Sequence, residues 1–95
     1  MPATTDAHVL QDSDQRAAIS RRLRRAHGQL GAVVRMLEDG RSCEDIVTQM
    51  AAVSKAVNTA AFTLIASSLR ECLADGSVTN DAMTAKLQKL FLSLA

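Results

Sequence analysis

The chain has two cysteines, Cys43 and Cys72, and their thiols have the widest range of chemistry among its side chains. A thiolate attacks electrophilic sulfur or carbon and binds soft metal ions, whereas a buried cysteine behaves as a small apolar residue. No CxxC, HExxH, Ser-His-Asp or acid-pair arrangement accompanies them, and no glycine-rich phosphate loop is present. The sequence therefore predicts a binding or sensing protein, not an enzyme.

A single long helix is predicted to carry both thiols. Ser42 followed by Asp45 is typical of a helix start, and the next helix-breaking pair is Asp75-Gly76. The 29-residue spacing of the cysteines leaves a net rotation of about 20° and a rise of about 43 Å. The two thiols thus share one face but are too distant for a disulfide within the helix. In an antiparallel dimer, Cys43 of one chain would lie beside Cys72 of the other.

The two thiols are expected to have different environments. Cys43 falls in the first turn, where the helix dipole favours a thiolate, and Arg41 is close in sequence. Cys43 is therefore the candidate attacking thiolate, and Cys72 the candidate resolving thiol. The alternative, that both are inert buried side chains, is equally compatible with the spacing alone.

Two more helices are predicted, which gives an all-α fold. The first starts near Asp14, with Ser13 or Asp12 as its cap, and ends at Gly40; the last spans about 80–92. Residues 1–13 are expected to form a flexible tail, and residues 14–95 a single helical DNA-binding and sensor domain. Three helices, one of them overlong, bury too little surface alone. We therefore expect an antiparallel dimer that forms a four-helix bundle.

Arginines dominate the first helix, and no acidic residue occurs between Arg16 and Leu37. Arg22, Arg25 and Gln29 share one side of it by helical spacing, Arg21 adds to this basic surface, and Arg35 extends it. The pattern predicts a DNA-binding face, and the alternative is a solvated basic surface. No apolar run reaches the roughly 18 residues of a membrane span, and no signal peptide is evident, so we expect a cytoplasmic protein.

Four stretches resemble the CsoR/RcnR-type family of transcriptional repressors. They are Arg22 to Gly31 (RLRRAHGQLG), Val34 to Cys43 (VRMLEDGRSC), Asp45 to Met50 (DIVTQM) and Leu69 to Cys72 (LREC), and the resemblance covers residues 15–92. It implies helical dimers that assemble into tetramers, bind operator DNA through a basic face that includes Arg25 and Gln29, and release it when an inducer reaches the cysteines.

The position of Ser68 favours one branch of this family. Its copper sensors carry a histidine four residues before the second cysteine, where this chain has Ser68, whose hydroxyl is a poor ligand for soft Cu(I). Two cysteines without that histidine resemble the persulfide-sensing, CstR-like branch. The inducer would then be a persulfide or polysulfide that joins Cys43 and Cys72 of adjacent subunits through a di-, tri- or tetrasulfide, without a cofactor.

Three alternatives remain open. Cu(I) sensing would use the two thiolates as metal ligands. Formaldehyde sensing would use Cys43 and the amine of Pro2, which becomes the N-terminus when Met1 is removed. An alternative of another class is a helical interaction module that does not bind DNA.

Overall fold

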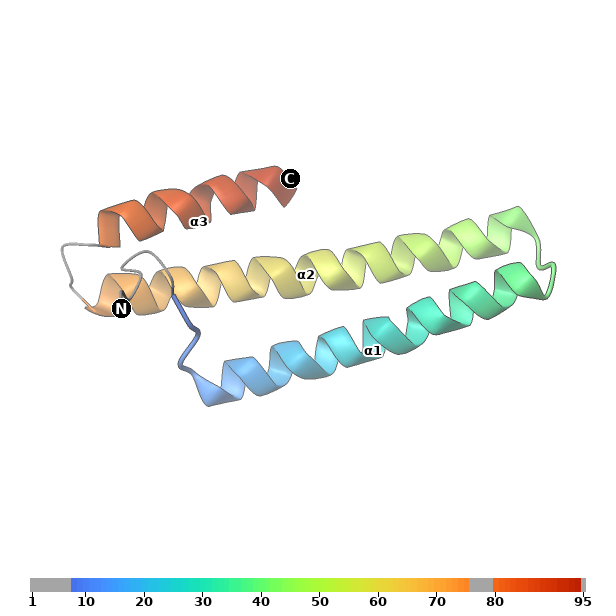
Figure 1. Cartoon of the computed structure of the whole chain (residues 1–95), viewed down its shortest axis with the longest axis horizontal. Coiled ribbons are helices and arrows are strands. Elements are labelled where there is room, and N and C mark those ends of the chain that lie inside the picture. Colours follow the sequence, from blue (N-terminus) through green and yellow to red (C-terminus); the bar gives the residue numbers. More distant parts are fainter. Residues whose placement is uncertain (1–7, 76–79, 95) are drawn as a thin grey trace, which may run out of the picture.

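The computed structural model describes residues 8–75 and 80–94 and contains three helices (Figure 1). Helix α1 spans Ser13–Glu38, α2 spans Cys43–Asp75 and α3 spans Asn80–Leu94. The first two form an antiparallel hairpin, and α3 runs back along the C-terminal half of α2 (Figure 1). The predicted all-α class is confirmed, and the molecule is a rod of 55 × 25 × 25 Å.

Local capping explains where α1 and α2 begin. The Asp12 carboxylate accepts hydrogen bonds from the backbone N–H groups of Asp14 and Gln15, at 3.0 and 3.1 Å. The Ser42 hydroxyl accepts one from the N–H of Asp45 at 3.2 Å. Between the helices, Gly40 has φ of 74°, a conformation that costs glycine little and other residues more. The predicted boundaries of these helices therefore agree with the structure to within two residues.

A buried seam holds α1 against α2. It consists of residues that recur every seven positions on each helix, namely Ile19, Ala26 and Val33 on α1 and Ile46, Val53 and Ala60 on α2. A seven-residue repeat keeps one stripe facing an antiparallel neighbour along its length. The two alanines are the most buried members of the seam, since Ala26 is 2% exposed and Ala60 is 1% exposed, and their small side chains permit a close approach of the helices.

Helix α3 packs only on α2 in the part of the chain that the structure describes. Phe62 and Phe91 pack in a tilted arrangement with ring centroids 5.0 Å apart and an interplanar angle of 55°, and this distance is within the favourable range for aromatic pairs. Met83 is buried near the start of α3, and Cys72 is buried near the end of α2. The C-terminal third of α2 is therefore the most enclosed part of the helix.

The expectation of a flexible tail over residues 1–13 is wrong for its last part. Residues 8–12 pack against α2, with Leu10 buried beside Ile19 and Ala60. The hydrophobic Leu10 and hydrogen bonds to Glu71 account for this order. Residues 1–7, including the Pro2 of the formaldehyde alternative, lie outside the described residues.

The surface of α2 is more apolar than its sequence suggested. The stretch Cys43–Ala74 is long and apolar enough to span a membrane by length and hydropathy, contrary to our expectation. Alanines raise the mean hydropathy without forming an unbroken run of large apolar residues. Only 22% of its most apolar part is buried, so most of this surface is uncovered in a single chain.

Overfilling the seam is expected to destabilise the fold. Ala26→Leu inserts three carbons where the helices touch and should lower the free energy of unfolding by about 1–3 kcal/mol. The matched control Ala17→Leu, on the exposed side of α1, should stay within about 0.5 kcal/mol of the parent. Urea unfolding at one fixed protein concentration measures both. Equal effects of the two substitutions would contradict this placement of the seam.

Candidate functional site

A basic groove runs along one side of the α1–α2 seam. It has a volume of about 530 Å³ and is lined by Ala18, Arg21, Arg22, Arg25, Ala56 and Thr59. Three of the predicted DNA-contacting arginines therefore gather at one place. The groove presents guanidinium donors from α1 and the hydroxyl-bearing Thr59 from α2, which is a suitable set for a phosphate group.

Thr59 was missed by sequence reasoning. A threonine within an alanine-rich helix carries no distinctive signal, and its position follows only from how α2 packs on α1. It lies next to the buried Ala60, so the same seam that joins the helices places it opposite the arginines.

The two remaining predicted DNA residues lie outside this groove. Gln29 is half-buried and one turn beyond Arg25, so helical spacing keeps it on the same side. Arg35 is exposed and is turned by about 80° from Arg25, and its guanidinium lies over Gly31. The basic surface thus continues to Gln29, whereas Arg35 points elsewhere.

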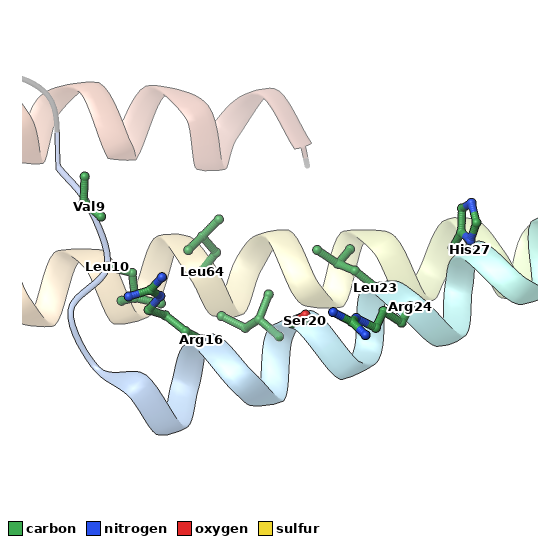
Figure 2. Close-up of a pocket in the computed structure, with 9 residues that line it drawn as sticks. Val9, Leu10, Arg16, Ser20, Leu23, Arg24, His27 and Leu64 are labelled. Carbon is green, nitrogen blue, oxygen red and sulfur yellow. The ribbon is translucent and has the colours of Figure 1, made fainter.

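An apolar groove of about 470 Å³ lies on the other side of the seam (Figure 2). Its apolar lining consists of Val9, Leu10, Ile19, Leu23 and Leu64, and it is also lined by polar residues that include Arg24 and His27. Because two residues in a helix turn by about 200°, Leu23 and His27 face nearly away from Arg25. The hairpin therefore has one basic and one apolar side.

The thiols lie near the two ends of α2. Cys43 is exposed at its first residue, Cys72 is 4% exposed near its last turn, and no disulfide is formed. Cys72 lies in the segment along which α3 runs (Figure 1). A single chain thus separates the thiols, as their spacing predicted.

No three-residue metal site is present within the described residues. Ser68, one turn before Cys72, is 5% exposed, and the neighbouring Ser67 accepts a hydrogen bond from Arg70 at 3.2 Å. His8 is bonded to Glu71, and His27 lines the apolar groove, so neither replaces the missing histidine beside Cys72. A soft metal ion would have to rely on the two thiolates.

Glu71, next to Cys72, receives three hydrogen bonds from the segment before α1. Its Oε1 accepts from His8 Nε2 and from the Gln11 backbone N–H, both at 2.9 Å, and its Oε2 accepts from the Asp12 N–H at 2.8 Å. The Gln11 bond lowers the pKa of Glu71 most; burial opposes this, while the Asp12 and His8 bonds add to it. The arrangement therefore favours the ionised carboxylate.

Comparison with known proteins identifies the family. Residues 15–93 match the family described as metal-sensitive transcriptional repressor. The chain belongs to this family. It is 34% identical over 61 residues to the copper-sensing transcriptional repressor RicR of Mycobacterium tuberculosis, over 64% of each chain. It is 32% identical over 75 residues to the copper-sensing transcriptional repressor CsoR of Bacillus subtilis, over 79% of this chain and 74% of CsoR. No solved structure matches it.

Membership of the metal-sensitive repressor family confirms the resemblance found in the sequence. The family consists of transcriptional repressors rather than enzymes, which agrees with our expectation. A helical module that does not regulate transcription does not fit it. The prediction of the persulfide-sensing branch is not tested by these relatives, which are both named as copper sensors.

Proposed function

We propose that this metal-sensitive repressor family member binds operator DNA in the cytoplasm and releases it when Cys43 and Cys72 of adjacent subunits are joined by reactive sulfur. The observation that carries this proposal is the division of the hairpin into a basic side and an apolar side. The basic side suits DNA. The apolar side suits a second subunit that completes the thiol pair.

An exposed stripe on α2 supports an antiparallel dimer. The stripe recurs every seven residues from the first thiol and consists of Cys43, Met50, Val57 and Leu64. Pairing Cys43 with Cys72 of a second chain puts the twofold axis between residues 57 and 58, next to Val57 of the stripe. Such a symmetric pairing creates two equivalent thiol sites per dimer.

Helix α1 adds a second exposed stripe to the same interface. Its members are Leu23, Leu30 and Leu37, again seven residues apart and all exposed in the single chain. Burial of two such stripes from each chain would form a four-helix bundle and cover the apolar surface of α2. Two dimers then form the tetramer that we expect for the repressor.

Phosphate contacts provide the DNA affinity. Arg21, Arg22 and Arg25 line a groove large enough for a phosphate group, and Gln29 continues the same side. Oligomerisation repeats this surface, so phosphate contacts accumulate and the affinity falls steeply with salt. A tenfold loss of affinity on induction needs only about 1.4 kcal/mol of coupling between thiols and DNA.

The thiol chemistry is an exchange reaction without a cofactor. The Cys43 thiolate attacks the sulfane sulfur of a hydropersulfide RSSH, which forms Cys43–S–SH and expels the thiolate RS⁻. The Cys72 thiolate of the adjacent subunit then attacks the inner sulfur, which forms the disulfide and expels HS⁻. Two thiol sulfurs are oxidised and one sulfane sulfur is reduced to sulfide. If both cysteines carry an extra sulfur, loss of HS⁻ gives a trisulfide, and longer donors give a tetrasulfide.

The residue one helical turn before Cys72 favours reactive sulfur over Cu(I) as the inducer. Ser68 stands there, and its hydroxyl is a hard donor that binds Cu(I) poorly. Two thiols alone are sufficient for the exchange reaction, whereas a three-ligand copper site lacks its third member.

Cu(I) sensing is the second candidate, because both relatives are named as copper-sensing repressors. The Cys43 and Cys72 thiolates of adjacent subunits would hold Cu(I) as two soft ligands. This arrangement needs the same dimer, so the two candidates differ in the inducer and agree on the assembly.

Removal of one groove arginine should weaken DNA binding uniformly. Arg25→Ala is expected to lower the affinity for operator and for unrelated DNA alike. It should also reduce the slope of log affinity against log salt by about 1 for each phosphate that the arginine neutralises. Arg24→Ala, which removes the same charge on the opposite side, should leave the slope unchanged. Fluorescence anisotropy over a salt series measures both, and a larger effect of Arg24→Ala would contradict the assignment.

Treatment with polysulfide should join two subunits. Mass spectrometry of the wild type is expected to show a crosslinked pair with zero, one or two extra sulfur atoms, and DNA should be released. Cys43→Ala and Cys72→Ala should give no crosslink, because each lacks one partner of the exchange. Unmodified thiols together with tight Cu(I) uptake that releases DNA would contradict the sulfur proposal and favour the copper candidate.

A further inference from the structure

Residues 8–12, here called the N-terminal strap, connect the Cys72 end of α2 to the start of α1. The strap crosses α2 before the chain turns into α1 (Figure 1). Leu10 anchors it in the small core formed with Ile19 and Ala60. The strap is therefore fixed at one point by apolar packing and at another by the carboxylate of Glu71.

Glu71 joins α2 to the strap through both of its carboxylate oxygens. These oxygens accept hydrogen bonds from His8, Gln11 and Asp12 at 2.8–2.9 Å. Two of the donors are backbone N–H groups, so they report the path of the chain and not a side-chain rotamer. The bonds join residues 59 to 63 positions apart in sequence.

The strap ends at the cap of the DNA-contacting helix. Asp12 caps α1 through its side chain, and its backbone carbonyl accepts the first helical bond, from Arg16 N–H at 2.9 Å. Arg21 and Arg22 follow about 14 Å further along α1. The Glu71 carboxylate therefore links the start of α1 to the turn of α2 that carries Cys72, the residue after Glu71.

Hydrogen bonds of this length are sensitive to small movements. A displacement of Glu71 by about 1 Å away from the strap would lengthen all three beyond hydrogen-bonding distance. Cys72 is buried, and a bond to Cys43 of another subunit requires its sulfur to become accessible. The adjacent Glu71 cannot keep its place if the last turns of α2 shift to allow this.

We propose that Glu71 is a positioning residue that couples the thiol pair to the DNA-binding groove: before the crosslink forms it holds the strap and the start of α1 in place, and the crosslink at Cys72 releases them. This inference rests on the proposed function. It adds the path by which the reaction at one end of α2 reaches the arginines of α1.

The test combines amide exchange with DNA affinity. Hydrogen exchange at the Gln11 and Asp12 amides is measured on the full chain before and after polysulfide, for the wild type and Glu71→Ala. DNA affinity is measured for the same samples. Glu38→Ala, which removes the same charge at the far end of α1, is the control. Circular dichroism confirms that each variant is helical.

The expected results follow from the three bonds. In the wild type, both amides lose protection when the crosslink forms, and DNA affinity falls about tenfold. Glu71→Ala lacks this protection from the start, and its loss of DNA affinity on crosslinking shrinks to about twofold. Glu71→Gln should be intermediate, because its remaining oxygen still accepts from His8 and Gln11. Glu38→Ala should match the wild type.

Three outcomes would overturn the inference. Glu71→Ala with the full tenfold response would show that the strap does not carry the coupling, and so would unchanged protection of the two amides in that variant. If Glu71→Ala loses its helicity, the same measurements are made on His8→Ala and Glu71→Gln. A wild-type loss of DNA affinity on crosslinking in both variants would also contradict the coupling. A crosslinked wild type that stays bound to DNA would instead refute the proposed function.

Discussion

The antiparallel seam between α1 and α2 is the constraint on which the rest of the structure depends. Buried apolar residues at seven-residue intervals, with the small Ala26 and Ala60 among them, join the helices and fix their rotation about their own axes. Once Ala26 and Val53 face inward, Arg25 must lie on one side of the seam and Leu23 on the other. The chemistry of each side is therefore a direct consequence of how the two helices pack.

The separation of the basic and apolar sides would let the proposed regulator bind DNA and a second subunit at the same time. In this proposal, DNA and a second subunit bind to different surfaces of the same hairpin, so they would not compete for residues. Communication between them must then pass through the hairpin itself. The contact of Glu71 with the N-terminal strap is a direct link from the Cys72 end of α2 to α1, the helix that carries the arginines.

The helices could be predicted from the sequence, but the choice of buried stripe could not. Asp12, Ser42 and Gly40 are strong local signals, and the structure places the boundaries where they predict. Helix α1 has two apolar stripes, and hydrophobicity alone favours the leucines over Ala26. The structure buries Ala26 and exposes Leu23, because close helix packing selects small residues and leaves the larger ones for another partner.

The candidate site could be predicted from the sequence only where its residues follow a local pattern. Arg22 and Arg25 were predicted through their helical spacing and Arg21 through the basic charge of the same stretch, which is local information. The place of Thr59 in the groove and the contacts of the strap depend on residues distant in sequence, and no local pattern predicts them. The expectation of a flexible tail failed because hydrogen bonds between residues about 60 positions apart order residues 8–12.

The central claim, that the reacting thiols belong to different subunits, can be tested by mixing two variants. Neither Cys43→Ala nor Cys72→Ala has a complete pair, but a mixed dimer has one Cys43 and one Cys72 on opposite chains. After subunit exchange and polysulfide treatment, we predict a crosslinked heterodimer in the mixture and none with either variant alone. If the mixture gives no crosslink under conditions in which the wild type reacts, or if the wild type yields only an intrachain bridge, the account is contradicted.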